Sequence, residues 1–580
     1  MAVYAISSEY SPERGFGLIT EQTRKNGVLP PGEELNAGFE PQPWYRSGAA
    51  FRAGQTSGFI PSCLRIDVPA HGNYRVALTI AQDGPDTRYG DVSDAGLDDR
   101  DVLVFAGDRQ LVFKGRMPEN GRPLEVRATV NVSDFVPRGF EDRGPQPVTF
   151  VTLAVVGAHA RPTQVSVEPA QVPTVWLAGD STVTDEGAQY PYAPSDPYCG
   201  WGAALGAWLN DGVAVSNHAR SGLTSLTFRS QRHYDPVRTD WKPGDVLLIQ
   251  FGHNDQKLPE LDARGGYRRE LDRYITEARA AGVRPILVTS LARNTWNPDG
   301  SYHDLLHDWA EAVIELGRDR HVPVLDLHAL SMKLVRKLGD EGARPMYHAG
   351  DRTHLHDVGA YRMAGLVAGE MRRVLSGWLP AAEPEGGNGD NGGNGDAGVR
   401  AREVDSYRAL AACVTDGFGD WPLPPRAYDV DRPQLVVDQY LNPLYLKYTA
   451  EPYITGDISP FRKAMLLLPV EEPEEDAAAA RDAARSAALR RSAIRRPLDV
   501  LLYVGPAIDP EPVVAAHSEL AAALAAGHAV ALVAYRTEKI EQNPASPVIP
   551  PDAVSYLRAN ADRYGISPEP VSVALGGELG

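Results

Sequence analysis

The sequence has few cysteines, no long apolar run and no concentration of positive charge. Its three cysteines, Cys63, Cys199 and Cys413, are spread over 580 residues and match no metal-ligand spacing or disulfide framework, so free thiols are expected. No apolar stretch approaches the ~20 residues that a helix needs to cross a bilayer, which excludes a membrane span. A formal net charge of -18 repels a phosphate backbone, so nucleic acid is not expected as a partner.

The first residues, MAVYAISSEYSPERG, also lack a secretion signal, since they have neither a basic start nor an apolar stretch of seven residues. We therefore expect a cytoplasmic location. Hydrophobic residues make up 43% and charged residues 23% of the chain, which is typical of a soluble globular protein. A chain of this length exceeds one hydrophobic core and predicts several domains.

Residues 1–170 read as an all-β domain, and we expect a sandwich. Short runs such as CLRIDVP, NYRVALTIA, DVLVFA and VTFVTLAVV are separated by Gly, Pro, Asp and Asn.

In residues 171–380 the sequence pattern changes from short strands alone to strands alternating with helices, which predicts an α/β domain. The buried-strand runs VWLAG, VAVSN, DVLLIQF, RPILVTS and HVPVLDLH alternate with amphipathic stretches such as YRRELDRYITEARAAG and LLHDWAEAVIELGRDR. Strands alternating with helices indicate a parallel sheet covered on both faces.

Residues 381–400 are rich in Gly, Asn and Asp and form an expected linker, and residues 401–580 form an expected partial α/β domain. In this tail the strand runs LDVLLYVG and HAVALVAYR accompany helical stretches and an acidic, alanine-rich segment.

Ser181 is the candidate nucleophile. The segment VWLAGDSTVTD places it directly after a buried strand, and ligands of open parallel sheets bind beyond the carboxyl ends of the strands. Alone, Gly-Asp-Ser is equally well explained as a turn or a helix cap.

A serine hydroxyl needs a base and an orienting carboxylate to become a nucleophile. The stretch HAGDRTHLHDVGAYR supplies both at Asp351 and His354, three residues apart on a loop before a helix. A single histidine is more often a surface or hydrogen-bonded residue, so the joint occurrence carries the argument.

Two further strand ends supply candidate oxyanion donors. Gly222 follows the strand VAVSN, and Asn254 lies in FGHNDQK after the next strand. The backbone N–H groups of Ser181 and Gly222 and the amide of Asn254 could stabilise a developing oxyanion, at about 3 kcal/mol each. The alternatives are a turn glycine and a capping asparagine.

The four blocks GDST, RSGLTS, GHND and DRTH, in this order and at strand ends, resemble the SGNH or GDSL-type hydrolase superfamily. The words GDSTVTD, GWG and FGHNDQK resemble its rhamnogalacturonan acetylesterase branch. This resemblance, over about 200 residues, implies a flavodoxin-like fold, with Ser181 as nucleophile, His354 as base and Asp351 as its orienter. It also implies Gly222 and Asn254 as oxyanion donors.

The flanking regions resemble other families more loosely. The leading β-domain is similar to galactose-binding-like sandwiches, with a structural role expected. The tail resembles an α/β-hydrolase whose G-x-S-x-G elbow is replaced by residues 576–580, GGELG, so we expect it to be catalytically inactive.

Other candidate sites have weaker patterns. His303 and His307 have the i, i+4 spacing of a metal pair, but the Glu of H-E-x-x-H and a third ligand are missing, so no metal is expected. Trp296 and Tyr302 could wall a sugar site or pack within their loop. His218 and His356 receive no role.

The sequence therefore predicts a serine esterase without a cofactor, and the resemblance implies that it removes acetyl groups from carbohydrate. From the resemblance, rhamnogalacturonan oligosaccharides are the expected substrate, followed by xylan-type glycans. A lipase or thioesterase would use the same triad. A noncatalytic glycan-binding protein is the alternative from another class.

Overall fold

The computed structural model describes residues 2–19, 58–89, 92, 96–107, 109–136, 144–185, 192–195, 197–297, 300–348, 351–379 and 405–423, and shorter stretches at 445–450, 461–469, 500–505, 520, 522–523, 528–535 and 572–575. The chain divides into two compact units, residues 1–426 and residues 427–580. Each unit is described by itself.

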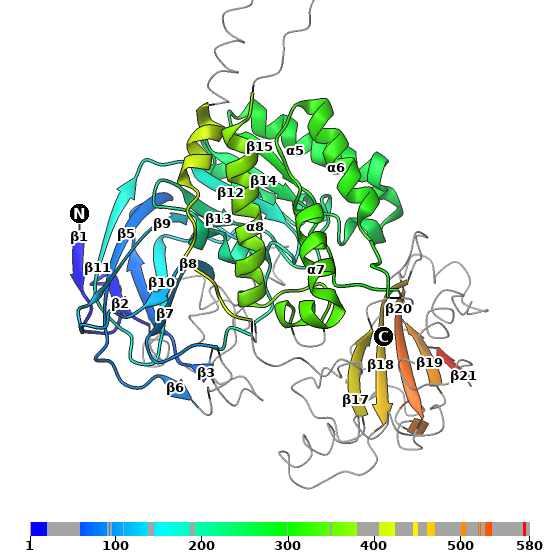
Figure 1. Ribbon diagram of the computed structural model, residues 1–580, viewed down its shortest axis with the longest axis horizontal. Coiled ribbons are helices and arrows are strands. Elements are labelled where there is room, and N and C mark those ends of the chain that lie inside the picture. The colour runs from blue at the N-terminus through cyan, green and yellow to red at the C-terminus, as the bar shows by residue number, and fades with distance from the viewer. Residues whose placement is uncertain are drawn as a thin grey trace, which may run out of the picture. The chain divides into compact units, whose positions relative to one another are not determined.

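The larger unit is built on one nine-stranded sheet, in the order β1-β11-β5-β9-β13-β12-β14-β15-β16 (Figure 1). Neighbours among the first four strands are antiparallel, and the remaining pairs are parallel. The halves join where β9 pairs with β13 at Val130 and Val215. In sheet order the strands are Ala2–Ala5, Arg161–Ala170, Gly72–Ala81, Leu124–Val132, Ala214–Asn217, Thr174–Gly179, Val246–Gln250, Arg284–Val288 and Val324–Leu325.

The parallel half has the strand order 2-1-3-4-5 of flavodoxin-like sheets when its strands are numbered along the chain. All six residues of β12 are buried, because helices cover both of its faces. Trp176 and Ala178 enter one core with α4, α5 and α6, whereas Val175 and Leu177 enter the other with η2, α7 and α8. These helices span Tyr234–Asp240, Arg268–Ala280, His307–Arg320, Trp201–Trp208, Leu327–Ala343 and Asp357–Ser376.

The antiparallel half packs on a second sheet, in the order β2-β4-β10-β7-β8. Alternate residues of β5, including Val76, Leu78 and Ile80, are buried against this sheet, and this period of two indicates a strand with one covered face. Two sheets therefore pack face to face in this part of the chain. A separate, galactose-binding-like domain stays a prediction. The strands of the second sheet are Phe16–Leu18, Ser62–Asp67, Phe150–Val156, Asp101–Ala106 and Gln110–Arg116, and Gly58–Phe59 pairs separately with Arg88–Tyr89 as β3 and β6.

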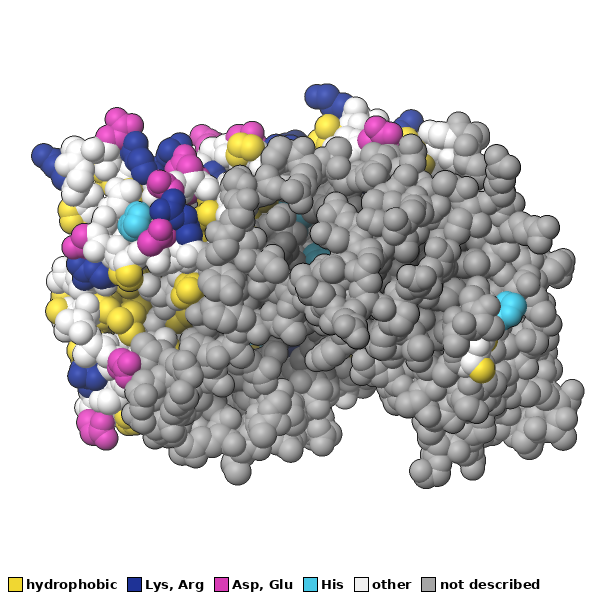
Figure 2. Space-filling model, turned by 90° about the horizontal axis from the view of Figure 1, so that it is seen from below, with side chains coloured by type: hydrophobic (Ala, Val, Ile, Leu, Met, Phe, Trp, Pro, Cys, Tyr) yellow, Lys and Arg dark blue, Asp and Glu magenta, His cyan; other side chains and the backbone are white. Residues whose placement is uncertain are grey.

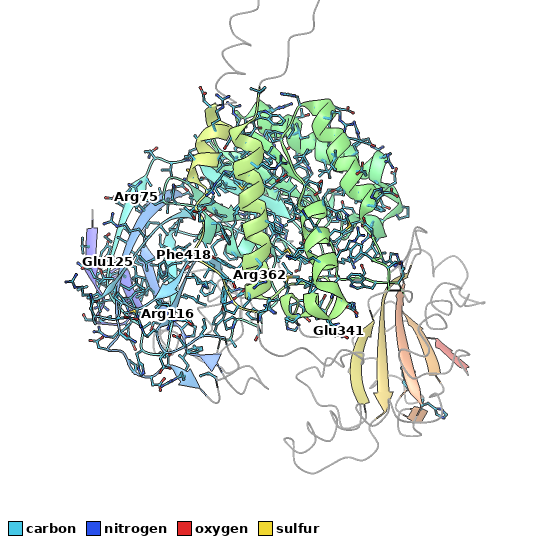
Figure 3. The ribbon with its side chains drawn as sticks, viewed as in Figure 1. Arg75, Arg116, Glu125, Glu341, Arg362 and Phe418 are labelled. Atoms are coloured by element: carbon cyan, nitrogen blue, oxygen red, sulfur yellow. The ribbon has the colours of Figure 1, made fainter. Side chains whose placement is uncertain are left out.

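The expected domain boundary after residue 170 lies inside this first compact unit, because Ala170 ends β11 and the next strand, β12, belongs to the same sheet. Residues 405–423 also belong to this unit, whereas the sequence predicts them as part of a separate tail domain over residues 401–580. Tyr407 is fully buried and donates its hydroxyl to the Pro285 carbonyl at 2.8 Å. Phe418 lies edge-on to Phe113 of β8 at 4.8 Å and is labelled in Figure 3.

The smaller unit contains a five-stranded sheet in the order β17-β18-β20-β19-β21. The first two pairs are antiparallel and the last two are parallel. The strands are Tyr445–Ala450, Phe461–Pro469, Ala529–Tyr535, Val500–Gly505 and Ser572–Leu575. Two expected strands are found here, whereas the alanine-rich helix and the expected elbow at 576–580 lie outside the described residues. The α/β-hydrolase resemblance stays a prediction.

Acidic and basic side chains intermingle on the described part of the face shown in Figure 2. Many pair with each other on the sandwich, for example Arg88 with Asp86 at 2.7 Å. Among the described residues, no helix is long and apolar enough to span a membrane. The three cysteines are free, as expected.

Candidate active site

Ser181 lies in a turn immediately after β12, at the carboxyl end of the parallel sheet. The N–H groups of Val183 and Thr184 donate to the Asp180 carbonyl at 3.0 and 3.1 Å, which closes the turn. Ser181 is 6% exposed, so most of the residue is packed against its surroundings. The strand-end position predicted from the sequence is therefore the one observed.

His354 reaches this serine from the loop before α8. Its Nε2 lies 2.9 Å from Ser181 Oγ, and its Nδ1 lies 2.8 Å from Asp351 Oδ2. A carboxylate only accepts hydrogen bonds, so Nδ1 carries the proton and the neutral ring leaves Nε2 free to accept from the Ser181 hydroxyl. The three residues thus have the geometry of a serine, base and orienter chain.

Asp351 is held in place by its own loop. Its Oδ1 accepts the N–H groups of Thr353 at 2.7 Å and His354 at 2.9 Å. Burial would raise the pKa of the Asp351 carboxyl. The positive charge that His354 carries when protonated, with the hydrogen bonds from His354 and the Thr353 N–H, outweighs burial and holds that pKa below its ordinary value. The carboxylate is therefore ionised at neutral pH and fixes the histidine tautomer.

The two candidate oxyanion loops meet each other. Asn254 Nδ2 donates to the carbonyl of Leu223, the residue after Gly222, at 3.0 Å, and Asn254 Oδ1 accepts from Lys257 at 3.1 Å. Gly222 has φ +81° and open space where a side chain would lie. The glycine loop and the asparagine are therefore brought together, while their roles as donors stay a prediction.

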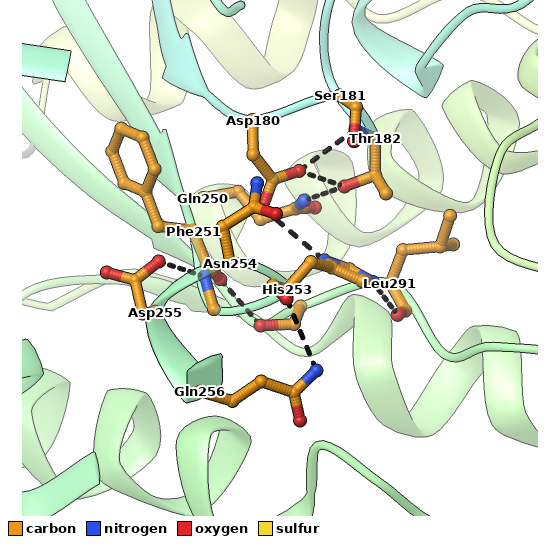
Figure 4. A network of polar contacts seen from close by, with 12 residues as sticks. Asp180, Ser181, Thr182, Gln250, Phe251, His253, Asn254, Asp255, Gln256 and Leu291 are labelled. Atoms are coloured by element: carbon orange, nitrogen blue, oxygen red, sulfur yellow. Dashed lines mark hydrogen bonds and ion pairs between the residues drawn. The ribbon is translucent and has the colours of Figure 1, made fainter. Parts of the chain in front are cut away.

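Asp180, in the turn that carries Ser181, and His253 form a buried pair that the sequence motifs alone do not predict. Asp180 Oδ1 accepts the Thr182 N–H at 2.9 Å and the Thr182 hydroxyl at 2.8 Å (Figure 4). Asp180 Oδ2 lies 3.4 Å from His253 Nδ1, and His253 Nε2 donates to the Leu291 carbonyl at 2.9 Å. Asp180 belongs to the GDST block and His253 to the GHND block, and these motifs are the signal in the sequence that could have indicated the pair.

A second buried chain links the turn to the GWG segment. Gln250 Nε2 donates to the Thr182 hydroxyl at 2.6 Å, and Trp201 Nε1 donates to Gln250 Oε1 at 2.7 Å. All three side chains are at most 1% exposed. The turn that carries Ser181 is therefore fixed from two directions.

Tyr198 was missed because nothing in the sequence brings it near the histidine. Its ring stacks on His348 with centroids 3.6 Å apart, and it lies edge-on to His354 at 5.8 Å. Tyr198 is 37% exposed, so a large aromatic face borders the candidate site.

The aromatic wall considered at Trp296 and Tyr302 is packed within its own loop. The two rings meet at 5.6 Å and 90°, and both polar atoms are used: Trp296 Nε1 donates to Asn294 at 2.7 Å and the Tyr302 hydroxyl to the Arg293 carbonyl at 2.8 Å. A sugar contact there stays a prediction.

The other histidines have structural surroundings. Helix α6 begins at His307, so His303 lies outside it and the spacing expected for one helix face is wrong. Within the described ranges no three metal-ligating side chains cluster. His356 caps α8, and burial lowers its pKa to about 4, while burial lowers that of His218 to about 3.

Comparison with known proteins gives concordant matches to this region. The GDSL-like Lipase/Acylhydrolase family model matches residues 177–361. The rhamnogalacturonan acetylesterase RhgT of Bacillus subtilis is 34% identical over 208 residues, which cover 33% of this chain and 87% of that protein. The probable rhamnogalacturonan acetylesterase YesY of the same organism is 31% identical, with 34% and 93% covered.

Among solved structures, that of the Bacillus subtilis protein YxiM is similar at 19% identity and a TM-score of 0.36, covering 65% of this chain and all of that chain. Ser181, Asp351 and His354 all lie within residues 177–361, which the family model matches. The chain belongs to the GDSL or SGNH hydrolase family and is a carboxylic ester hydrolase.

Proposed function

We propose that the protein removes O-acetyl groups from carbohydrate through an acyl-enzyme on Ser181. The observation that carries this proposal is the continuous hydrogen-bonded chain from Ser181 through His354 to Asp351, with atom separations of 2.9 and 2.8 Å. Such a chain converts a weak serine hydroxyl into a nucleophile.

In the first half-reaction His354 Nε2 takes the Ser181 proton while Oγ attacks the acetyl carbonyl carbon. The carbonyl oxygen becomes negative, and we assign its stabilisation to the N–H groups of Ser181 and Gly222 and the amide of Asn254. Collapse of the intermediate breaks the ester C–O bond, and His354 returns the proton to the sugar oxygen that leaves. The acetyl group stays on Ser181.

In the second half-reaction His354 takes a proton from water, and the resulting hydroxide attacks the acetyl carbonyl. The second tetrahedral intermediate releases acetate, and the proton returns to Ser181 Oγ. Asp351 stays ionised throughout and stabilises the imidazolium that forms twice in each cycle.

The substrate class rests on the relatives. One relative named as a rhamnogalacturonan acetylesterase is 34% identical to this chain over its catalytic region, and a second, named as a probable one, is 31% identical. Acetylated rhamnogalacturonan oligosaccharides are therefore the proposed substrate. A cytoplasmic location, with imported oligosaccharides as substrate, is part of the same proposal.

The test is acetate release from acetylated rhamnogalacturonan oligosaccharides, compared with acetylated xylo-oligosaccharides and a p-nitrophenyl ester chain-length series. Wild type is expected to release acetate from the rhamnogalacturonan substrate, and Ser181→Ala to lose nearly all of this activity while keeping its circular dichroism spectrum. A preference for long acyl chains without glycan activity would favour a lipase or thioesterase. Undiminished turnover by Ser181→Ala would refute the assigned nucleophile.

Absence of both ester hydrolysis and fluorophosphonate labelling would instead favour a glycan-binding protein. An activated serine reacts with that reagent, whereas a binding module does not.

A further inference from the structure

Arg109 lies in the turn between β7 and β8 of the sandwich, yet its side chain is fully buried. Arginine is rarely buried to this degree unless its charge is paired and its donors are used. The partners of its guanidinium therefore indicate which segments it stabilises.

The guanidinium of Arg109 joins three segments of the hydrolase half. Nε and Nη2 donate to the carbonyl of Asp185 at 3.0 and 2.6 Å, and Nη2 also donates to the carbonyl of Tyr198 at 3.2 Å. Nη1 pairs with the carboxylate of Asp357 at 2.5 Å, and that carboxylate also accepts from Tyr192. One planar fork thus serves two carbonyls and a buried carboxylate.

Each of these three segments lies next to Ser181 or His354, either along the chain or through a ring contact. Asp185 lies four residues after Ser181. Asp357 is the first residue of α8, just after His354, and Tyr198 lies edge-on to the His354 ring. The serine and the histidine come from chain segments far apart in sequence, so their 2.9 Å approach requires both segments to be held against a common support.

We propose that Arg109 is a positioning residue for the esterase reaction, supplied by the β-sandwich, which sets the approach of His354 to Ser181. The inference rests on the proposed roles of those two residues. Gln110, the next residue, strengthens the same connection by donating to the Asp185 carboxylate and the Gly202 carbonyl, both at 2.7 Å. In this proposal the sandwich supports the catalytic centre without contacting the reacting atoms.

Arg109→Lys is the test variant. Lysine keeps the positive charge opposite Asp357, but its single ammonium cannot reproduce the planar fork toward the carbonyls of Asp185 and Tyr198. A displacement of about 1 Å between reacting groups can cost on the order of 100-fold. We therefore expect kcat for p-nitrophenyl acetate to fall about 10- to 100-fold, with KM within about twofold.

A second readout follows Ser181 directly. The rate constant for inactivation by a small fluorophosphonate should fall by about the same factor as kcat, because both depend on proton transfer from Ser181 to His354. A purely structural role would lower the melting temperature and the active fraction, while the folded fraction would keep the wild-type rate constant.

Arg65→Lys is the matched control. Arg65 is another buried sandwich arginine, 3% exposed, which pairs with Asp67 at 2.8 Å and packs over the rings of Tyr10 and Phe150. These contacts lie within the sandwich, so Arg65→Lys should leave kcat and the inactivation rate constant unchanged.

If Arg109→Lys does not fold, the double variant Arg109→Gln with Asp357→Asn removes both buried charges and is measured in the same way, with the same loss of kcat expected. A folded Arg109→Lys with kcat within twofold of wild type would overturn the proposal, as would failure of both variants to fold. Wild-type hydrolysis that does not depend on Ser181 would instead overturn the proposed function.

Discussion

Asp351 fixes the orientation of His354 through three hydrogen bonds, two from backbone N–H groups and one from the histidine ring. The backbone bonds stop the carboxylate from rotating, so the Nδ1 proton has one acceptor. In the proposed mechanism Asp351 therefore selects the tautomer of His354, in addition to stabilising the imidazolium by its charge.

Asp351→Asn is expected to lower kcat about 10³- to 10⁴-fold, because an amide can donate to Nδ1 and stabilise the tautomer in which Nε2 carries the proton. Steady-state kinetics with p-nitrophenyl acetate measure the effect. Asp304→Asn is the matched control, since Asp304 bonds His328 at 3.1 Å outside the proposed triad. Equal losses in both variants would contradict the assignment.

Asp185 predicts a pH-dependent stability. Burial raises the pKa of its carboxyl to about 6, although Asn217 and Gln110 donate hydrogen bonds to it. Between the ordinary value of about 4 and about 6, the folded state keeps a proton that the unfolded state has lost, so this group makes stability fall as pH rises. Above pH 6 the cost is constant, at most about 3 kcal/mol.

Asp185→Asn removes this titration while keeping an oxygen that can accept from both amides. Relative to wild type, the variant should be equally stable near pH 4 and more stable near pH 7, by about 1–3 kcal/mol. Melting temperatures at the two pH values provide the measurement. A difference that is the same at both would show that Asp185 does not titrate in this range.

At the scale of elements, the turn that carries Ser181 depends on a close backbone approach. A Cβ on Gly200, the residue before η2, would lie 2.1 Å from backbone atoms of Thr182 and Val183. At Gly222 the same atom would meet open space. Gly200 is therefore required by lack of space, whereas Gly222 is favoured only by its positive φ of +81°.

Gly200→Ala is expected to lower both the melting temperature and kcat, the latter at least 100-fold, because the turn must move. Gly222→Ala should cost only about 1–2 kcal/mol of backbone strain and retain kcat within about tenfold, since its N–H group remains. Thermal melts and kinetics of the two variants distinguish the cases. A severe loss at Gly222 with a mild one at Gly200 would reverse this interpretation.

The parallel strands and the helices α5 and α6 could be predicted from the sequence because their apolar runs and periodicity are local properties. The motifs at strand ends likewise placed Ser181, His354 and Asp351. The joining of β9 to β13 could not be predicted, because β9 has the alternating pattern of any sandwich strand and its partner lies far along the chain. Arg109 gave no signal, since a polar residue in a turn is ordinary until its buried contacts are known.

At the scale of the molecule, the nine-stranded sheet predicts that sandwich and hydrolase halves lose structure together. Ile80→Ala in the sandwich core, where Ile80 is fully buried, should cost about 2–5 kcal/mol. The temperature at which esterase activity is lost should fall with the unfolding temperature. Val3→Ala at the exposed edge strand is the control, as Val3 is 45% exposed. Unchanged heat inactivation in Ile80→Ala would show that the halves unfold independently.

The β9 and β13 junction has a consequence for biosynthesis. The edge of β9 leaves the ribosome well before β13 does, so a sandwich that folds on emergence presents unpaired N–H and C=O groups to the strand that follows. The hydrolase strands can then add one by one to a preformed edge as they are synthesised. A substitution that slows folding of the sandwich would leave these strands unpaired for longer, and they could then pair with other nascent chains on the same messenger RNA.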